Sequence, residues 1–464
     1  MTERVKSSLV LCGALMAWSL AHSATPECPV GSYRLADGTL VDIAPSDEDT
    51  LRWRQLDGST GALHRDSSGI WNSTYGWTDR PDGKVVSFSD CSGGQLRFAG
   101  VAGQKVVFDE HEVTFHSHGV TLAGRLLMPP GEDRVPIVVL LHGSERDSAL
   151  TYYSLQRILP AEGVGAFVYD KRGTGKSGGH YTQDFSLLAD DAVAAVREAR
   201  SLAGERLGRV GYQAGSQGGW VAPIAANRTA VDFVIVCFGL AVSVIDEDQQ
   251  SVQLQLSERG YDSTQIAAAL EVAGAAEAVF ASGFTRGFAH FDALRASYRD
   301  APWYKDLRGD YTWILLPHSE AELRAMRADY TWGTPFNYDP MPTLRAGRTP
   351  QLWILGGEDY EAPSRETSRR IKSLITTGRP LTLAYYPDAE HGITLFESGS
   401  DGSRTSTRYA PGYFRLIIDF ARDGYLHGSY GDAEITPRVA EPHVVSAPRA
   451  TKQQLSTPAA RGEP

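Results

Sequence analysis

The residues whose types and spacing point most directly to chemistry surround Ser216, in the segment Ala214-Gly-Ser-Gln-Gly-Gly219. This segment follows a short apolar stretch and leads into an apolar helical run over 220–227. A serine on a sharp strand-to-helix turn needs small neighbours, and the turn lifts its hydroxyl clear of the sheet. The turn also aims the backbone N–H of Gln217 at the place where an oxyanion would form. The sequence therefore predicts a nucleophile elbow, with Ala214 in place of the first glycine of the usual G-x-S-x-G pattern.

A histidine and a carboxylate are needed because a serine hydroxyl is a weak nucleophile near neutral pH. In hydrolases with this elbow they follow the serine in the order acid, then histidine. An apolar strand over 351–357 ends at Glu358-Asp359-Tyr360-Glu361, and a second strand over 381–386 ends shortly before His391. Open α/β sheets collect ligands at the carboxyl ends of their strands. We therefore expect His391 to be the base and Asp359 its carboxylate, while Glu358 and Glu361 stay open as alternatives for the acid.

Two further strand ends complete the pattern upstream of the serine. The stretch Ile137–Leu141 runs into His142-Gly143-Ser144, and 166–169 runs into Asp170-Lys-Arg-Gly-Thr-Gly-Lys-Ser177. With these motifs, residues 113–424 resemble an α/β-hydrolase of the serine esterase kind. The resemblance implies a mostly parallel sheet with helices on both faces, and the triad Ser216, Asp359 and His391. It also implies an oxyanion hole formed by the backbone N–H groups of Ser144 and Gln217.

The resemblance also sets the expected organisation and reaction. The catalytic domain would span 111–240 and 350–425, because the segment 241–349 is far longer than a crossover needs and reads as an inserted helical cap. Some of the cap aromatics should line an apolar pocket above Ser216, so we expect hydrolysis of small hydrophobic or aromatic esters through an acyl-enzyme. A peptidase or a thioesterase with the same triad remains an alternative, as does a catalytically inactive binding protein.

Outside the resemblance lie an N-terminal segment and a tail. Residues 25–110 carry short alternating stretches separated by Asp-Gly turns, which predict a small antiparallel β domain. Its aromatics, Trp71, Tyr75 and Trp77, would form either its core or a ligand platform, and Cys28 could form a disulfide with Cys91. Cys237 lies in an apolar strand and reads as an inert core thiol. The tail over 436–464 is rich in Pro, Ala and charge and is expected to be disordered.

The remaining patterns concern location and partners. Residues 1–24 have the charged start, apolar stretch and small-residue cleavage pattern of a signal peptide, so we expect a secreted protein. The apolar stretch is too short for a membrane span. The net charge of −11, with both signs interspersed, gives no reason to expect nucleic acid. No cofactor or metal is expected: Asp170 stands where a phosphate-binding loop needs glycine, and His116 and His118 lack further ligands nearby.

Overall fold

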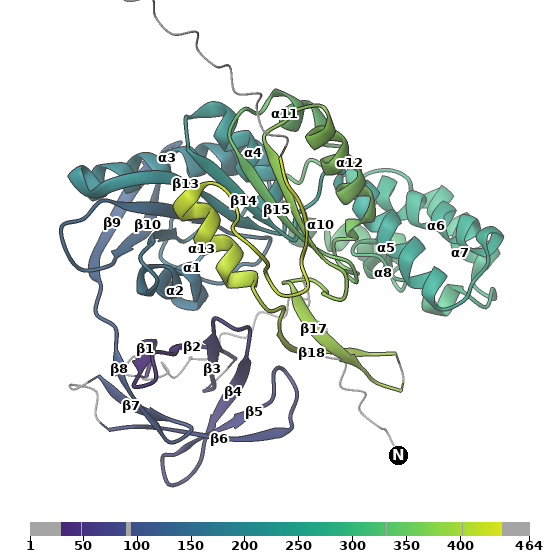
Figure 1. Cartoon of the computed structure of the whole chain (residues 1–464). Coiled ribbons are helices and arrows are strands. Elements are labelled where there is room, and N and C mark those ends of the chain that lie inside the picture. Colours follow the sequence, from purple (N-terminus) through teal and green to yellow (C-terminus); the bar gives the residue numbers. More distant parts are fainter. Residues whose placement is uncertain (1–28, 48, 90–93, 331, 401, 439–464) are drawn as a thin grey trace, which may run out of the picture.

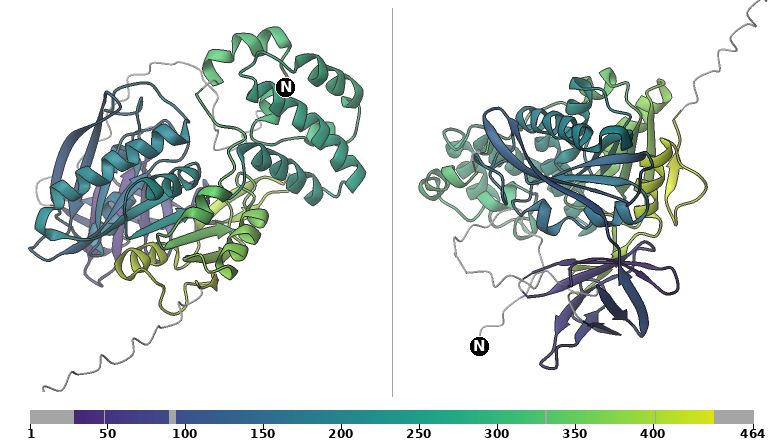
Figure 2. Two further views of the ribbon diagram at one scale, coloured as in Figure 1. Left: turned by 90° about the horizontal axis from the view of Figure 1, so that it is seen from above. Right: turned by 90° about the vertical axis from the view of Figure 1, so that its left-hand side faces the viewer.

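The computed structural model describes residues 29–47, 49–89, 94–330, 332–400 and 402–438. The expected signal peptide, the expected Cys28–Cys91 disulfide and nearly all of the tail over 436–464 lie outside these residues. The described chain forms an N-terminal β-barrel, an α/β domain and a helical cap (Figure 1). The barrel lies beneath the α/β domain, and the cap projects from another side of it (Figure 2).

The N-terminal domain is a closed antiparallel barrel, in which the first strand pairs with the eighth. Its strands are β1 (Gly31–Leu35), β2 (Leu40–Pro45), β3 (Leu51–Gln55), β4 (Thr60–Arg65), β5 (Trp71–Thr74), β6 (Pro81–Phe88), β7 (Gln95–Phe98) and β8 (Val101–Lys105). Closure leaves the barrel without a free edge. Trp53 and Trp71 are buried in its core, and Trp77 packs against Tyr409 of the α/β domain with ring centroids 5.4 Å apart. The aromatics therefore do not form one exposed platform, and only Tyr75 of the three is exposed, at 40%.

The α/β domain is built on a nine-stranded sheet in the order β19-β16-β15-β14-β13-β11-β12-β10-β9. The strands are β9 (Asp109–Ser117), β10 (Val120–Met128), β11 (Val135–Leu141), β12 (Gly165–Tyr169), β13 (Leu207–Gly215), β14 (Phe233–Cys237), β15 (Gln351–Gly356), β16 (Leu381–Tyr386) and β19 (Glu434–Thr436). The central six are parallel. They are apolar on both faces because helices cover both sides. The expected α/β-hydrolase fold, with its cap and small β domain, is confirmed.

Two groups of helices cover the sheet. One face packs against α3 (Phe185–Ala203), α4 (Gly218–Arg228) and α12 (Ser364–Thr376). The other packs against α1 (Ala149–Tyr152), α2 (Leu155–Ala161) and α13 (Tyr413–Asp423). Helix α13 ends at Gly424, whose φ of 77° is the left-handed geometry of a helix C-cap. The carboxyl ends of the parallel strands stay open between these layers, and the candidate site lies there.

The cap is an all-helical insertion between β14 and β15. Its helices are α5 (Val244–Glu258), α6 (Ser263–Ala281), α7 (Phe288–Tyr298), α8 (Thr312–Leu315), α9 (Glu320–Ala325), α10 (Arg327–Tyr330) and α11 (Met341–Ala346). Capping boxes begin α6 at Asp262 and α9 at Ser319. Within the described chain, α6 is the one helix long and apolar enough to cross a membrane. Its apolar side is buried in the cap core against Trp303 and Phe291. This burial accounts for the many apolar residues of α6.

Two short elements differ from expectation. The sequence over 397–407 is polar and shows no alternation of apolar residues, but the structure has a two-stranded hairpin there, β17 (Thr394–Ser398) and β18 (Arg404–Tyr409). Its polar side chains bond to the barrel and to the loops beside the site, so they need no apolar core of their own. The last strand, β19, pairs with β16 and extends the sheet beyond residue 425, where we expected the domain to end.

Candidate active site

Ser216 occupies the sharp turn between β13 and α4, as an elbow requires. Its φ is 49°, in the left-handed region that side chains other than glycine seldom adopt. The turn packs tightly against its surroundings: a Cβ on Gly219 would lie 2.9 Å from the Cα of Gly239. Ala214 is fully buried and is tolerated in place of glycine. The local sequence therefore holds the serine in a strained conformation at the sheet edge.

His391 and Asp359 meet at the same edge, at the ends of β16 and β15. The Nδ1 atom of His391 lies 2.9 Å from Oδ2 of Asp359 and 3.2 Å from Oδ1. Oδ1 also accepts a 2.8 Å hydrogen bond from the backbone N–H of Ala362. Asp359 is 1% exposed, so the carboxylate is fixed and its charge is directed at the imidazole. In Ser-His-Asp triads a contact of this kind orients the histidine.

Glu361, one of the alternatives for the acid, contacts the other side of the imidazole. Its Oε1 lies 3.5 Å from Nε2 of His391. Burial alone would lower the pKa of His391, but the charges of Asp359 and Glu361 outweigh burial and raise the pKa to about 10. The two carboxylates thus contact different nitrogens of the imidazole. Asp359 bonds Nδ1, whereas Glu361 lies beside Nε2, the nitrogen that faces away from Asp359.

The loop after β11 carries Ser144 and a carboxylate that the sequence analysis did not single out. The backbone N–H of Gly143 lies 3.2 Å from Oε1 of Glu145, and the hydroxyl of Tyr153 donates to the same oxygen. Burial raises the pKa of Glu145, but the nearby charges of His142 and Lys171 outweigh it, so that the pKa lies below its usual value. A Cβ on Gly143 would lie 3.4 Å from Cβ of Ser216, so this loop adjoins the serine.

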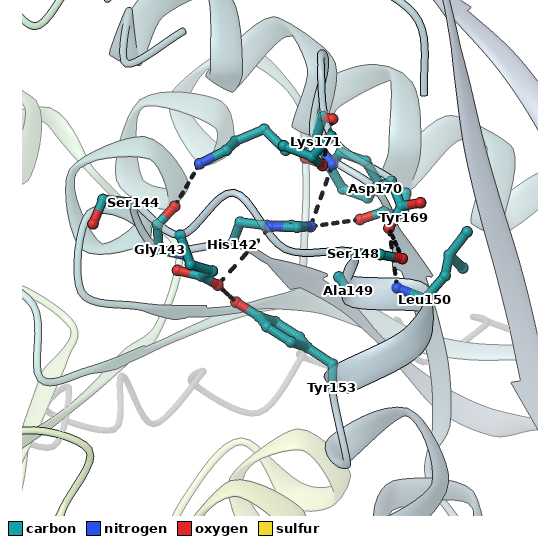
Figure 3. A network of polar contacts seen from close by, with 12 residues as sticks. His142, Gly143, Ser144, Ser148, Ala149, Leu150, Tyr153, Tyr169, Asp170 and Lys171 are labelled. Carbon is teal, nitrogen blue, oxygen red and sulfur yellow. Dashed lines mark hydrogen bonds and ion pairs between the residues drawn. The ribbon is translucent and has the colours of Figure 1, made fainter. Parts of the chain in front are cut away.

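A buried polar network holds that loop in place (Figure 3). The Nζ of Lys171 donates to the carbonyl of Gly143 at 2.7 Å, and Nε2 of His142 lies 2.9 Å from the carbonyl of Tyr169. Asp170 accepts from Ser148 at 2.8 Å and from the backbone N–H of Lys176 at 2.7 Å. The carboxylate of Asp170 therefore fills the loop that resembled a phosphate site. His142 is part of this support and bonds no triad member.

Of the two predicted oxyanion residues, Gln217 directly follows the serine, and Ser144 follows Gly143 in the loop that adjoins it. Gln217 is the N-cap of α4, where the first N–H groups of a helix have no partner inside it. The N–H of Ser144 shares its peptide with the carbonyl of Gly143, which Lys171 binds at 2.7 Å. The carbonyl of Ser144, in the next peptide, accepts a 2.5 Å hydrogen bond from the hydroxyl of Tyr181. The side-chain Oε1 of Gln217 is buried, and within the described chain it has no hydrogen-bond partner.

The structure brings the acid and base together more closely than the base and serine. Among the described residues, it gives no hydrogen bond between Oγ of Ser216 and His391. Phe238 bridges the two: its ring lies 4.8 Å from the His391 ring, centroid to centroid, and adjoins Gly215 of the elbow. Catalytic hydrogen bonds are often long before substrate binds, so the missing bond does not exclude Ser216 and His391 as partners. The described residues hold no group of three or more His, Cys, Asp or Glu side chains suited to a metal ion.

Comparison with known proteins agrees with this fold. Residues 132–258 match the family model described as serine aminopeptidase, S33, a range that includes the elbow but not Asp359 or His391. No curated protein matches the chain. Similar solved structures include an esterase from Pyrococcus furiosus, with 16% identity over 61% of this chain and 84% of that chain and a TM-score of 0.40. They also include an acylaminoacyl peptidase from Pyrococcus horikoshii, with 14% identity over 84% of this chain and 57% of that chain and a TM-score of 0.41.

The sheet order, the elbow and the family match make the chain a member of the α/β-hydrolase superfamily. They indicate a hydrolase of the kind that cleaves esters or peptides.

Proposed function

We propose that the protein is a serine hydrolase that cleaves carboxylic esters through an acyl-enzyme intermediate. The observation that carries the proposal is the placement of Ser216 at a φ of 49° on the strand edge where His391 bonds Asp359. A strained serine beside an oriented imidazole is an arrangement that serves nucleophilic catalysis. Residues 1–24 add the proposal that the enzyme acts outside the cytoplasm.

The chemistry divides into two steps. Oγ of Ser216 attacks the acyl carbon while Nε2 of His391 takes the hydroxyl proton, and the N–H groups of Ser144 and Gln217 bind the oxyanion. The intermediate collapses as His391 returns the proton to the leaving alcohol, which leaves the acyl group on the serine. His391 then takes a proton from water, the hydroxide adds to the acyl carbon, and the acid departs as Ser216 regains its proton. Asp359 balances the imidazolium charge in both steps.

The preference for aromatic or hydrophobic esters rests on rings beside the oxyanion loop. The ring of Tyr181, whose hydroxyl bonds Ser144, lies 5.6 Å from the ring of Trp332 in an edge-to-face arrangement. The guanidinium of Arg146 lies over both rings, at 4.4 and 4.6 Å. Trp332 belongs to the cap, so the cap places an aromatic ring beside the residue that binds the Ser144 loop. Aromatic surface of this kind favours an aryl or alkyl substituent.

A second candidate, cleavage of substrates with a free amino group, is favoured by the acidic groups around His391. Besides Glu361, burial raises the pKa of Asp310 and of Glu247 well above the usual value, and neighbouring carboxylates add to the shift in each case. Carboxylates that raise one another's pKa in this way would gain from a nearby ammonium group. The matched family, described as a serine aminopeptidase, agrees with such a substrate.

The experiment that tests the proposal uses purified mature protein and its Ser216→Ala variant. We expect a fluorophosphonate probe to label Ser216 in the parent, and Ser216→Ala to lose at least ~10³-fold in ester hydrolysis with an unchanged melting temperature. Neutral aryl esters and amino-acyl anilides should be compared at one pH. Faster turnover of the anilides would favour the second candidate, and undiminished ester hydrolysis by Ser216→Ala would refute the mechanism.

A further inference from the structure

The hairpin β17–β18 connects the barrel to the two loops that carry His391 and Asp359. It begins at Thr394, a few residues after His391, and it lies between the barrel and the base of the cap (Figure 1). One strand contacts the barrel strand β4. The hairpin is therefore placed to transmit support from the barrel to the site.

Arg404, the first residue of β18, binds the loop that carries Asp359. Its Nη1 donates to the carbonyl of Glu358 at 2.6 Å, and its Nη2 donates to the Glu358 carboxylate at 2.9 Å. The guanidinium carbon lies 3.5 Å from the ring centroid of Tyr360. Arg404 thus holds the residue before Asp359 and the residue after it. Its side chain is 12% exposed, so these contacts are shielded from solvent.

The same side chain reaches the cap. Nη2 of Arg404 lies 3.5 Å from Oε2 of Glu258, at the end of α5, and the hydroxyl of Tyr360 donates to that carboxylate oxygen. Ser251 of α5 donates to the carbonyl of Tyr360 at 2.8 Å. The acid loop is therefore bound from two sides, by β18 and by the first helix of the cap.

The histidine loop is tied to the hairpin as well. The hydroxyl of Ser406 on β18 donates to the carboxylate of Glu390 and lies 3.1 Å from the hydroxyl of Thr394 on β17. The backbone N–H of Glu390 donates to the carbonyl of Thr394 at 2.9 Å. Since Glu390 immediately precedes His391, the hairpin fixes the backbone on which the imidazole is carried.

The barrel holds the other side of β18. The N–H of Trp77 donates to the carbonyl of Ser406 at 2.9 Å, and the N–H of Tyr409 donates to the carbonyl of Gly58 at 2.9 Å. The approach at Gly76 leaves no room for a side chain: a Cβ there would lie 2.5 Å from the Cα of Thr407. A strand held this closely has little freedom to shift while the barrel stays docked.

We infer that Arg404 is a positioning residue for the triad, and that the N-terminal barrel supports it by holding β18. The inference rests on the proposed function, because it concerns the alignment of Asp359 with His391. Arg404 touches neither substrate nor the reacting atoms. It acts by keeping the carboxylate in line with Nδ1, and a misplacement of about 1 Å at such a contact can cost ~10²-fold in rate.

The first test compares Arg404→Ala with Arg404→Lys in the full-length protein. We expect Arg404→Ala to lower kcat by ~10- to 10²-fold with little change in KM, and added methylguanidine to restore part of the loss. Lysine keeps the charge but loses the planar two-point contact and the stacking, so Arg404→Lys should be intermediate. Arg369→Met is the control, since the side chain of Arg369 is 70% exposed and pairs with Glu366 of the same helix, α12.

A second readout does not depend on turnover. The proton shared by His391 and Asp359 should give a low-field NMR resonance, assigned by its absence in His391→Asn. We expect Arg404→Ala to shift or broaden it while Arg369→Met leaves it unchanged. If the parent protein shows this resonance but no labelling at Ser216, the proposed function fails while the positioning role stands. An unchanged resonance together with an unchanged kcat in a folded Arg404→Ala protein would overturn the inference.

The role of the barrel is tested by a matched pair of glycine substitutions. Gly76→Ala forces a Cβ against the backbone of Thr407, whereas Gly83→Ala has a similarly positive φ, of 77°, and open space around it. Both incur the same kind of backbone strain, so only the contact with the hairpin differs. We expect Gly76→Ala to reduce kcat by ~10-fold or more relative to Gly83→Ala. Equal activity of the two variants would show that the barrel does not support the site.

Discussion

The carboxylate of Glu361 offers a direct test of how the base is tuned. The proton acceptor in the mechanism is neutral His391, and the nearby carboxylates raise its pKa to about 10. Activity should therefore rise with pH up to about that value, because deprotonation creates the active form. Glu361→Gln removes a negative charge that favours the protonated imidazole, so the acid limb of the pH profile should move to lower pH.

The size of the shift follows from the distance. At 3.5 Å, two unit charges attract by about 1.2 kcal/mol in bulk water and by about 4.7 kcal/mol at an effective dielectric constant of about 20. The side chain of Glu361 is 36% exposed, so solvent screening brings the value towards the lower figure. About 1.4 kcal/mol corresponds to one pKa unit, and we expect a downward shift of about one unit. Below the pKa, that shift raises kcat/KM about tenfold.

The assay is the pH dependence of kcat/KM on a neutral aryl ester, which reports the free enzyme. The control is Glu320→Gln, which removes a carboxylate paired with Arg324 on the surface of the cap and should leave the limb in place. An acid limb that stays at the same pH or moves to higher pH in Glu361→Gln would refute the electrostatic reasoning. A loss of about 10³-fold across all pH values would instead identify Glu361, in place of Asp359, as the acid of the triad.

Three further predictions concern stability and location. Arg157 binds the fully buried Asp42 of the barrel at 2.8 Å, so Arg157→Met should lower the free energy of unfolding by about 3–5 kcal/mol. Urea denaturation measures this free energy, and a loss below ~1 kcal/mol would contradict the prediction. Burial raises the pKa of the Cys237 thiol to about 11, so a thiol reagent at pH 8 should modify Cys237 only after unfolding, and rapid labelling of the native protein would disagree. The exported protein should begin after Ser23 or Ala24, which N-terminal sequencing of the secreted fraction checks; recovery of the intact N-terminus there would refute cleavage.

The fold and the candidate triad could be predicted because each feature has a local signal. The elbow shows itself as small residues around Ser216, and Asp359 and His391 each follow an apolar strand. In a parallel sheet those strand ends meet at one edge, so chain order was enough to place the acid and the base together.

The residues that support the site have no such signal. Glu145 is one charge in a polar loop, and its position depends on Tyr153 and Lys171, which lie on different elements. Arg404 stands in a polar stretch that resembles a surface loop, and its partners lie far away in the sequence. The hairpin itself was missed because its strands are stabilised by contacts with the barrel, and alternation of apolar residues does not mark them.

The contact between the first domain and β18 also constrains the order of folding. The barrel strands β1–β8 are synthesised first. Because they pair only with one another, the barrel can close before the rest of the chain is made. Helices α1 and α2, which also contact the barrel, follow soon afterwards, but the hairpin is made only after the whole cap. Contacts between residues so distant in sequence form slowly, and domains made from the N-terminus onward usually fold as units. The folded barrel would therefore keep the part of its surface that binds β18 uncovered until the hairpin has been made, and the site would be completed late in synthesis.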